Sequence, residues 1–570
     1  MKQILFFAML LLALVSCKQK ANQQEPLGGK GMVFCKPQTS DKDWYAAGTK
    51  APRIQGLEGL HFPITTNSKE AQDYFSQGLM LSYGFNHAEA ARSFYEAIRI
   101  DSTCAMCYWG YAYVLGPNYN GGMEQDNFER AYIAAQRAMR LADNSTKLEK
   151  ELIQALGYRY VKSPPEDRSD LDKAYAQAMK KVYENNASNP DVGALYAESL
   201  MNLHPWDLYD KNKEPQPWTP ELVSILEQLI KANPRHPGAH HFYIHAVEAS
   251  ASPERGLESA RILETLVPGA GHLVHMPSHI YINTGDYHLG SLANIAAVKA
   301  DSTYITSCHA QGVYPLAYYP HNYHFLAATA TLEGNSQLAW MAAKKVQALT
   351  AKDIMRQPGW GTLQHYYTIP YYVAVKFGMW DTILELPAPD LDLSYPQAVL
   401  HYARGMAFLG KKDISQAEKE LDKLNSIAQD TSLKSLTIWD INSSYDLLQI
   451  ASNLLSAEIA AHQKQHQRAI SLMQKAVAIE DQLNYNEPPD WFFSVRHHLG
   501  SVYLKAGMFS EAEKVYQDDL RKWPKNGWAL VGLYNALNAQ KKEKEATSAK
   551  EAFDSAWQYA DKSITSSSPL

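Results

Sequence analysis

The sequence lacks the features of several large protein classes. Strand-type alternation rich in Val, Ile and Thr is nearly absent, which argues against a β-sheet fold. With 54 basic and 60 acidic residues and a net charge of −6, the chain lacks the basic surface of a nucleic-acid-binding protein, so we expect no nucleic-acid partner. Beyond residue 15, no apolar run is long enough to span a membrane. What remains is a chain of 570 residues, 46% hydrophobic, that can bury a large core.

The N-terminus has the pattern of an export signal. A charged start and the short apolar run 4–15 predict a signal peptide over residues 1–16. It ends in Leu-Val-Ser-Cys, which resembles the bacterial lipobox, where the cysteine is lipidated and becomes the mature N-terminus. We therefore expect a lipid on Cys17, and residues 17–67 to form a tether and N-terminal extension. The alternative is a plain secretory signal. The expected location is the bacterial cell envelope, anchored on the periplasmic side or the outer surface of a membrane.

Four cysteines follow Cys17, and an oxidising envelope compartment would let them pair. Cys104 and Cys107 have thioredoxin-like spacing, but no βαβ pattern surrounds them. We expect this pair to serve packing or a structural disulfide rather than redox catalysis.

Helical periodicity dominates from about Ser68 onward. Small and large residues recur with one spacing, as in Gly78, Ala90, Phe94 and Ala97, and again near both residue 290 and residue 510. This spacing resembles the tetratricopeptide repeat (TPR) family over residues 68–562. The resemblance implies an all-α helix-turn-helix solenoid, wound as a right-handed superhelix and interrupted by loop insertions.

Proline-rich stretches set the expected boundaries of this array. Residues 163–165 and 207–220 read as loops that leave the solenoid, and residues 387–396 as a seam. We expect an N-terminal and central TPR array over residues 68–386 and a C-terminal TPR array over 387–562. Residues 563–570 (SITSSSPL) are expected to be a flexible tail.

Histidines are concentrated in three central repeats, whose register can be set from Pro and Gly alone: Pro237–Ala270, Gly271–Tyr304 and Pro320–Asp353. In TPR proteins the second, fifth, ninth and twelfth places of the first helix face the concave groove. Seven of the nine histidines in these repeats occupy place two, five or nine, and a glutamate occupies place twelve. These eight residues are His241, His245, Glu248, His272, His275, His279, His321 and His324.

Imidazoles at i, i+4 spacing on adjacent helices, with a carboxylate beside them, can supply three or four ligands to a divalent transition metal. No thiolate is present in the cluster, so Zn²⁺, Fe²⁺, Mn²⁺ and Cu²⁺ are all admissible. The HExxH pattern of zinc proteases is absent. Glu248 is a candidate ligand or a candidate catalytic base, and Asp207 is the other candidate base.

Further polar and aromatic residues are expected to line the same groove: His204, Trp206, Tyr318, Tyr319, Asn322 and His365. The histidine blocks themselves, such as HHFYIHAVEAS and GHLVHMPSHIYINTGDY, resemble those of a group of bacterial TPR lipoproteins. That resemblance implies that the blocks form one site, and it implies no activity.

Three functions are compatible with these patterns. The first is an envelope-anchored TPR protein whose groove binds a divalent metal, or a small or peptide ligand, through the His/Glu cluster. The second is a metal-dependent hydrolase or oxidoreductase built on a TPR scaffold. The third is a protein-protein assembly scaffold that grips a protein or peptide partner. Because ordinary scaffolds clamp carboxylates with Lys, Arg and Asn, a histidine-lined groove favours the first two.

Overall fold

The structure of the chain is a computed structural model that describes residues 42–308, 314–389 and 392–570. The expected signal peptide, Cys17 and residues 18–41 of the expected tether and N-terminal extension lie outside the described residues. Among the described helices, none is both long and apolar enough to cross a membrane.

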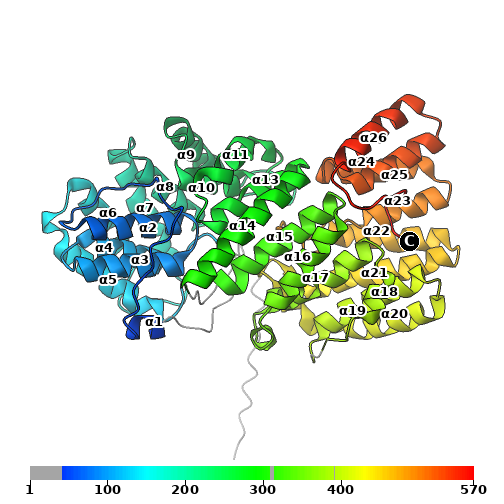
Figure 1. Cartoon of the computed structure of the whole chain (residues 1–570), viewed down its shortest axis with the longest axis horizontal. Helices are drawn as coiled ribbons and strands as arrows, with labels where there is room; N and C mark the ends of the chain where they lie inside the picture. Colours follow the sequence, from blue (N-terminus) through cyan, green and yellow to red (C-terminus); the bar gives the residue numbers. More distant parts are fainter. Residues whose placement is uncertain (1–41, 309–313, 390–391) are drawn as a thin grey trace, which may run out of the picture.

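Helices dominate the described chain and follow one another in pairs joined by short turns (Figure 1). The first arm contains α1 (Lys42–Ala46), α2 (Lys69–Tyr83), α3 (His87–Ile100), α4 (Ala105–Val114), α5 (Asn127–Leu141), α6 (Lys147–Gly157), α7 (Ser169–Asn185), α8 (Pro190–Met201) and α9 (Thr219–Ala232). The central helices are α10 (Pro237–Val247), α11 (Leu257–Leu266), α12 (Gly271–His275), α13 (Pro277–Thr284), α14 (Tyr287–Cys308), α15 (Tyr319–Leu332), α16 (Ser336–Leu349), α17 (Gly361–Lys376) and α18 (Trp380–Glu385). The last arm contains α19 (Ser394–Gly410), α20 (Ile414–Ala428), α21 (Ser444–His462), α22 (His466–Glu480), α23 (Arg496–Lys505), α24 (Phe509–Lys522), α25 (Gly527–Ala539) and α26 (Glu543–Ala556).

One small hairpin interrupts the helices of the described chain. Strands β1 (Thr437–Ile438) and β2 (Asn442–Ser443) pair antiparallel between α20 and α21. The all-α helix-turn-helix solenoid expected from the sequence is therefore confirmed, with loops inserted between repeats.

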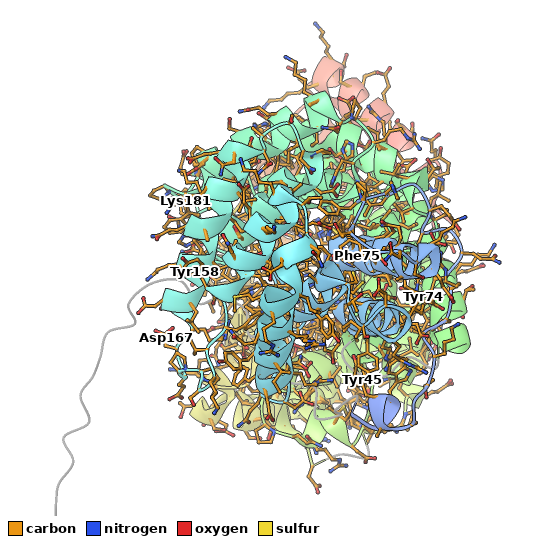
Figure 2. The ribbon with its side chains drawn as sticks, turned by 90° about the vertical axis from the view of Figure 1, so that its left-hand side faces the viewer. Tyr45, Tyr74, Phe75, Tyr158, Asp167 and Lys181 are labelled. Carbon is orange, nitrogen blue, oxygen red and sulfur yellow. The ribbon has the colours of Figure 1, made fainter. Side chains whose placement is uncertain are left out.

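The first repeat shows why the recurring residues fold this way. Phe94 of α3 is fully buried between α2 and α4, and a Cβ added to Gly78 or Gly110 would lie only 2.9 or 2.4 Å from its ring. Ala90 and Ala97 are also fully buried, so small residues let the helices approach closely. Figure 2 shows Phe75 inside this arm, whereas Tyr158 and Lys181 lie at its periphery.

We expect Ala97→Leu to lower the free energy of unfolding by about 1–3 kcal/mol, because the added methylenes overpack a fully buried helix crossing. Urea unfolding followed by circular dichroism measures the loss, and Ile133→Ala, at a side chain 54% exposed, should change stability by no more than about 0.5 kcal/mol. An Ala97→Leu protein as stable as the wild type would contradict the repeat register.

Proline and glycine shape the central repeats. Pro277 divides the first helix of this repeat at Met276 into α12 and α13, because proline cannot donate a backbone hydrogen bond. Gly285 then caps α13 in the left-handed region, with φ of 79°, and a Cβ there would meet the carbonyl oxygen of Pro524 at 2.2 Å. The turn between α13 and α14 thus touches the last arm directly.

The last arm packs back onto the central repeats. The hydroxyl of Tyr287 donates to the carbonyl of Pro524 at 2.8 Å, and the indole N–H of Trp528 donates to the carbonyl of Thr331 at 3.0 Å. Two large apolar cores meet in the central repeats, one reaching Tyr318 and the other starting at Ile282. The two cores therefore overlap along the chain at α13–α15, the helices that carry His279 and His321. The seam expected at residues 387–396 stays a prediction.

The C-terminal segment, expected to be a flexible tail, is packed against α23 and α24. Ser567 is 1% exposed, and its Oγ donates to the carbonyl of His497 at 2.7 Å. The hydroxyl of Tyr516 lies 2.7 Å from the same Oγ. The expectation was wrong because it rested on polarity alone, and a serine-rich segment can exchange water for specific hydrogen bonds.

Cys104 and Cys107 are buried free thiols in the structure. The Sγ of Cys104 caps α4 by accepting from the backbone N–H of Cys107 at 3.2 Å. Of the two roles expected for this pair, packing fits these positions.

Candidate metal centre

The clustered histidines come from α10, α12, α13 and α15 and lie inside the molecule. His241, His245, His272, His275 and His279 are each at most 3% exposed. Ring centroids are 4.9 Å apart for His241 and His245, and 4.7 Å apart for His275 and His279. The structure thus brings together residues that the repeat register placed on one face.

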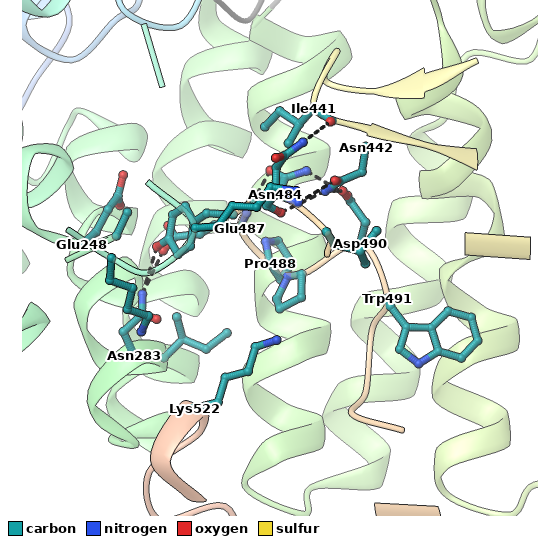
Figure 3. Close-up of a pocket in the computed structure, with 18 of the residues that line it drawn as sticks. Glu248, Asn283, Ile441, Asn442, Asn484, Glu487, Pro488, Asp490, Trp491 and Lys522 are labelled. Carbon is teal, nitrogen blue, oxygen red and sulfur yellow. Dashed lines mark hydrogen bonds between the residues drawn. The ribbon is translucent and has the colours of Figure 1, made fainter. Parts of the chain in front are cut away.

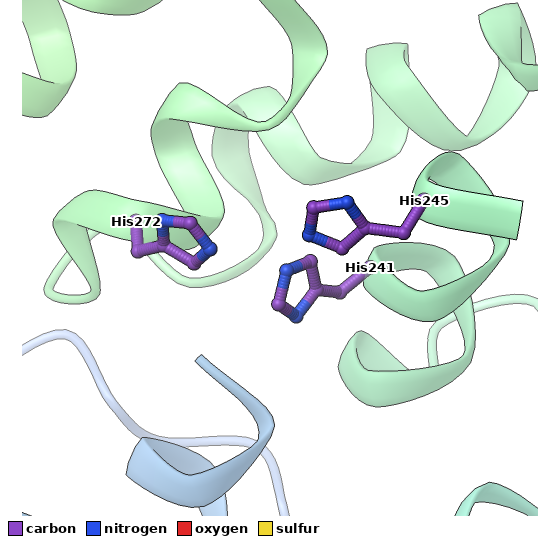
Figure 4. Close-up of side chains that lie close together, drawn as sticks. All are labelled: His241, His245 and His272. Carbon is purple, nitrogen blue, oxygen red and sulfur yellow. The ribbon is translucent and has the colours of Figure 1, made fainter. Parts of the chain in front are cut away.

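One trio of rings is formed by His241, His245 and His272 (Figure 4). One ring nitrogen of each residue lies within 4.8 Å of the other two. Nδ1 of His241 lies 2.6 Å from the carbonyl oxygen of Tyr83, and Nδ1 of His245 lies 2.8 Å from Oε1 of Glu248. Since both oxygens accept, each Nδ1 carries the proton and each Nε2 presents a lone pair.

These lone pairs have no hydrogen-bond partner among the described residues. Nε2 of His241, Nε2 of His245 and both ring nitrogens of His272 are buried and unpaired. A buried polar group without a partner costs about 1–3 kcal/mol, so such groups are rare unless something binds them. A metal ion is the partner that three converging imidazole lone pairs fit.

A second trio lies beside the first and consists of His275, His279 and His321. Nε2 of His275 is 2.8 Å from Nε2 of His279 and 3.2 Å from Nε2 of His321. Nδ1 of His275 is 2.7 Å from the side-chain oxygen of Asn294, which fixes its proton on Nδ1. Again the Nε2 atoms converge.

Two carboxylates hold the rings in place. Glu248 uses Oε1 for His245 and Oε2 for His279, whose Nδ1 lies 2.6 Å away. Glu487 also contacts Nδ1 of His279. The expectation that Glu248 is a ligand or a base is therefore refined, because both of its oxygens already orient a histidine.

Sequence reasoning missed Glu487. It lies in the loop between α22 and α23, more than 200 residues from His279, and this loop folds back over the central repeats. The available signal was the Glu487-Pro488-Pro489 run, which interrupts the helical periodicity of the last arm. Such a run predicts a loop, but not the part of the chain that the loop contacts.

The charges of this cluster shift the pKa values of its members. Burial alone lowers the pKa of His279, but the carboxylates of Glu487 and Glu248 outweigh it and raise the pKa to about 10. Burial raises the pKa of Glu487 to about 8, helped by the negative charge of Glu248. Burial lowers the pKa of His321 to about 3, and it also holds those of His241, His272 and His275 well below the usual value.

We expect the metal-free protein to lose stability as the pH falls below 6.5. Burial lowers the folded-state pKa of His365 and of His321 from 6.5 to about 3. The unfolded chain then binds more protons in this window, so stability present above pH 6.5 is lost toward pH 3, by at most about 1.4 kcal/mol per pH unit for each histidine. Urea midpoints at pH 7.5 and 5.5 measure how steeply the free energy of unfolding falls with pH. His365→Gln should reduce this slope by the contribution of one proton, at most about 1.4 kcal/mol per pH unit. An unchanged slope would contradict burial of a neutral His365.

A cavity of about 640 Å³ opens beside the histidines (Figure 3). Its lining includes His245, Glu248 and Glu487 on the side of the cluster, and Trp491 and Phe492 of the α22–α23 loop. Hydrogen bonds hold the polar groups on its wall: Asn442 to Asp490 at 2.7 Å, Asn486 to Asp490 at 2.8 Å and Asn283 to Glu487 at 2.9 Å. This size lies in the range of sites for small molecules.

A smaller chamber of about 30 Å³ lies next to this cavity. It is lined by His245 and His272 of the first trio, and by His279 and His321 of the second. Glu487, Trp206, Asn486 and His245 border both spaces, so the chamber adjoins the larger cavity. A space of this volume holds about one water molecule or an ion with its ligand.

Three of the expected site residues, Trp206, Asp207 and Tyr318, line the two spaces, and Asn322 lines neither. Trp206 stacks on Tyr119 at 5.3 Å and lines both spaces, and Tyr318 lines the chamber with its edge against His272. Asp207 lines the cavity, where burial raises the pKa of its carboxyl, and accepts from Gln216 at 3.0 Å. Asn322 is buried and donates to Asp301 at 2.6 Å.

The other expected residues lie elsewhere. His324, expected as a metal ligand, belongs to neither trio; it stacks on Phe492 at 5.2 Å, and its ring is 5.5 Å from that of His365. His365 itself lies 2.8 Å from the hydroxyl of Tyr395. His204 stacks on Trp218 at 3.7 Å outside the cavity lining, and Tyr319 packs edge-on against Tyr323. His324 lies about one helical turn beyond His321 on α15, where it contacts the α22–α23 loop through Phe492.

Comparisons with known proteins give architecture alone. No protein-family model matches the chain, and no curated protein matches it. Among solved structures, it is similar to the APC/C hetero-tetramer Cut9-Hcn1 (13% identity, 87% of this chain, 80% of that chain, TM-score 0.34). It is also similar to the human IFIT1 dimer with m7Gppp-AAAA (13% identity, 88% of this chain, 92% of that chain, TM-score 0.30). A further similar structure is yeast Tom70 (11% identity, 84% of this chain, 90% of that chain, TM-score 0.25). The chain is an all-α helix-turn-helix solenoid, and a cluster of histidines and glutamates lies inside it.

Proposed function

We propose that this chain is an envelope-anchored TPR-type protein that binds a transition-metal ion through its buried histidines and acts as a metal-dependent enzyme on a small molecule. One observation carries the proposal: His241, His245 and His272 direct unpaired ring nitrogens toward one another in the interior. Two of these rings have the proton fixed on the far nitrogen, as metal ligands require. Zn²⁺, Fe²⁺, Mn²⁺ and Cu²⁺ all accept imidazole ligands at such a site.

The cavity favours an enzyme over a scaffold for a protein partner. The histidines lie beneath Trp206 and Tyr318 rather than on an open groove, and the adjoining cavity has the volume of a small-molecule site. A bound metal would supply Lewis acidity or redox chemistry next to this cavity. A hydrolase or an oxidoreductase is thus the reaction class that the site supports.

Glu487 is the best-placed proton carrier in the site. It borders both the chamber and the cavity, and burial together with the charge of Glu248 raises its pKa to about 8. A carboxyl whose pKa lies near neutrality can both give and accept a proton at working pH. Asn283 holds its Oε1 at 2.9 Å, which keeps the group directed at the cavity. Asp207, on another part of the lining, is the alternative base.

The anchor belongs to the same proposal. The Leu-Val-Ser-Cys block supports lipidation at Cys17 and a place in the bacterial cell envelope. Mass spectrometry of the mature N-terminus tests it, and an unmodified or internal Cys17 would refute it.

Elemental analysis tests the central point. The full chain, purified without a chelator or a histidine tag, should carry at least one equivalent of a transition metal. It should regain that metal after removal by a chelator and dialysis. A chain that carries none and takes up neither Zn²⁺, Fe²⁺, Mn²⁺ nor Cu²⁺ would end the proposal and favour the binding of a peptide or protein.

A further inference from the structure

We propose that His275, His279 and His321 form a second metal centre, so that the site holds a pair of copper ions separated by the small chamber. This inference rests on the proposed metal site and adds to it the number of ions, their class and the place of a bridging ligand. It makes the cluster a two-ion site of six histidines.

The distances within the second trio fit one shared ion. Two imidazole ligands of a tetrahedral ion, with bonds near 2.0–2.1 Å, lie about 3.3 Å apart. Nε2 of His275 lies 2.8 Å from Nε2 of His279 and 3.2 Å from Nε2 of His321. Neutral imidazoles without a shared ion or proton have no reason to bring lone pairs so close.

A proton on Nε2 of His279 satisfies only one of the two contacts that Nε2 of His275 makes. Nδ1 of His275 is already committed to Asn294, so its Nε2 offers a single lone pair. That lone pair faces Nε2 of His279 and Nε2 of His321 at once. Charging all three rings is excluded, because they are buried together and would repel. A metal ion interacts favourably with all three nitrogens.

The two trios are built as one unit. Glu248 contacts one histidine of each trio. Its Oε1 lies 2.8 Å from Nδ1 of His245 in the first trio, and its Oε2 lies 2.6 Å from Nδ1 of His279 in the second. The ring centroids of these two histidines are 5.6 Å apart. A single carboxylate therefore fixes one ligand of each centre, which is the arrangement expected of neighbouring ions that work together.

The ligand chemistry selects copper. Each trio offers three imidazole nitrogens and no oxygen ligand, whereas Mg²⁺, Ca²⁺ and Mn²⁺ prefer oxygen ligands and the common non-haem iron site adds a carboxylate. Glu248 forms a third possible group with His245 and His279, but each of its oxygens already contacts Nδ1 of one of these histidines. Among divalent ions, Cu²⁺ binds nitrogen sites most tightly. Copper can also bind as Cu⁺, which lowers the charge that the buried, uncharged ligand set must hold.

The chamber lies where a bridging ligand is needed. Its lining takes His245 and His272 from the first trio and His279 and His321 from the second. A volume of about 30 Å³ accommodates a water, a hydroxide or a molecule of similar size between two ions. Through Trp206 and Glu487 it adjoins the larger cavity, where a substrate can reach it.

The test loads the metal-free full chain with copper sulfate, followed by dialysis, elemental analysis and spin counting by electron paramagnetic resonance. We expect two copper ions per chain and a spin count far below the copper content, because neighbouring Cu²⁺ ions couple. His321→Ala should reduce the content from two ions to one and restore a spin count equal to the copper present. His275→Gln should do the same, which guards against failure of one variant to fold.

His288→Ala is the matched control, since His288 belongs to the same repeat as His275 but is half-buried and lies 3.0 Å from the carboxylate of the buried Glu333, outside both trios. It should keep both ions and the low spin count. One copper ion in the wild type, or two in His321→Ala, would overturn the second centre while leaving the first intact. A pair of zinc ions that copper does not displace would overturn the copper assignment. A chain that binds no metal would refute the proposed function as well.

Discussion

Replacing His272 by leucine should abolish metal binding at the first trio and leave the metal-free protein as stable as the wild type or more stable. Both ring nitrogens of His272 are buried without a hydrogen-bond partner in the described chain, so the substitution removes a ligand and breaks no hydrogen bond. An apolar side chain of similar size ends the cost of an unpaired buried imidazole, about 1–3 kcal/mol. A variant that loses the metal but gains stability shows that the original residue is kept for function rather than for folding.

His240→Leu is the matched control, because His240 is equally buried but bonded on both sides. Its Nδ1 lies 2.9 Å from Oγ of Ser259 and its Nε2 lies 2.9 Å from the carbonyl of Pro234. This variant should keep its metal and lose stability. Metal content and the urea midpoint of the chelated protein, measured for both variants, separate the two roles. A His272→Leu protein that retains full metal and unfolds at lower urea would make His272 structural.

Glu248→Gln should weaken metal binding by about 10–100-fold without abolishing it. The carboxylate accepts from Nδ1 of both His245 and His279. An amide of the same size has one oxygen and one NH₂ group. Its oxygen can accept from one ring, but its NH₂ group then faces the N–H of the other ring, and two donors cannot form a hydrogen bond. The ring that faces the NH₂ group must then carry its proton on Nε2, which removes the lone pair that the metal needs. The affinity is measured by competition with a chelator of known strength.

Glu258→Gln, at an exposed position on α11, removes the same charge from a residue that belongs to neither trio and should leave the affinity unchanged. The size of the effect also separates two roles for Glu248. Complete loss of metal would make it a direct ligand. An unchanged affinity would show that the two histidines need no carboxylate to orient them.

Most of the candidate site was predictable from spacing. Residues at places two, five and nine of a repeat share a face, so the positions of His241 and His245 on α10 and of His275 and His279 around Pro277 predicted a cluster. In α15 the same rule included His324, which belongs to neither trio. In a solenoid each helix turns relative to the last, so equal places in successive repeats do not remain equally near one point.

The roles within the cluster were not predictable in the same way. Sequence reasoning made Glu248 a ligand or base, because proximity along a helix does not show which atoms a carboxylate faces. The geometry adds that each oxygen contacts Nδ1 of a histidine, while Glu248 still belongs, with His245 and His279, to one of the groups that could hold a metal ion. Glu487 was missed entirely, since its contact with His279 bridges more than 200 residues and has no periodicity to reveal it.

The amino-acid sequence alone determines the local architecture. This includes the helix pairs, the small residues at their crossings, and the row of imidazoles on the inner face of three repeats. These features depend on residues at most one repeat apart, so their spacing carries the information. The packing of the last arm onto the central repeats, and the cavity that its loop encloses, emerge only when the whole chain is folded. The same is true of the ring nitrogens that remain unpaired. Those features depend on the summed rotation of many repeats, and no single stretch of sequence encodes that sum.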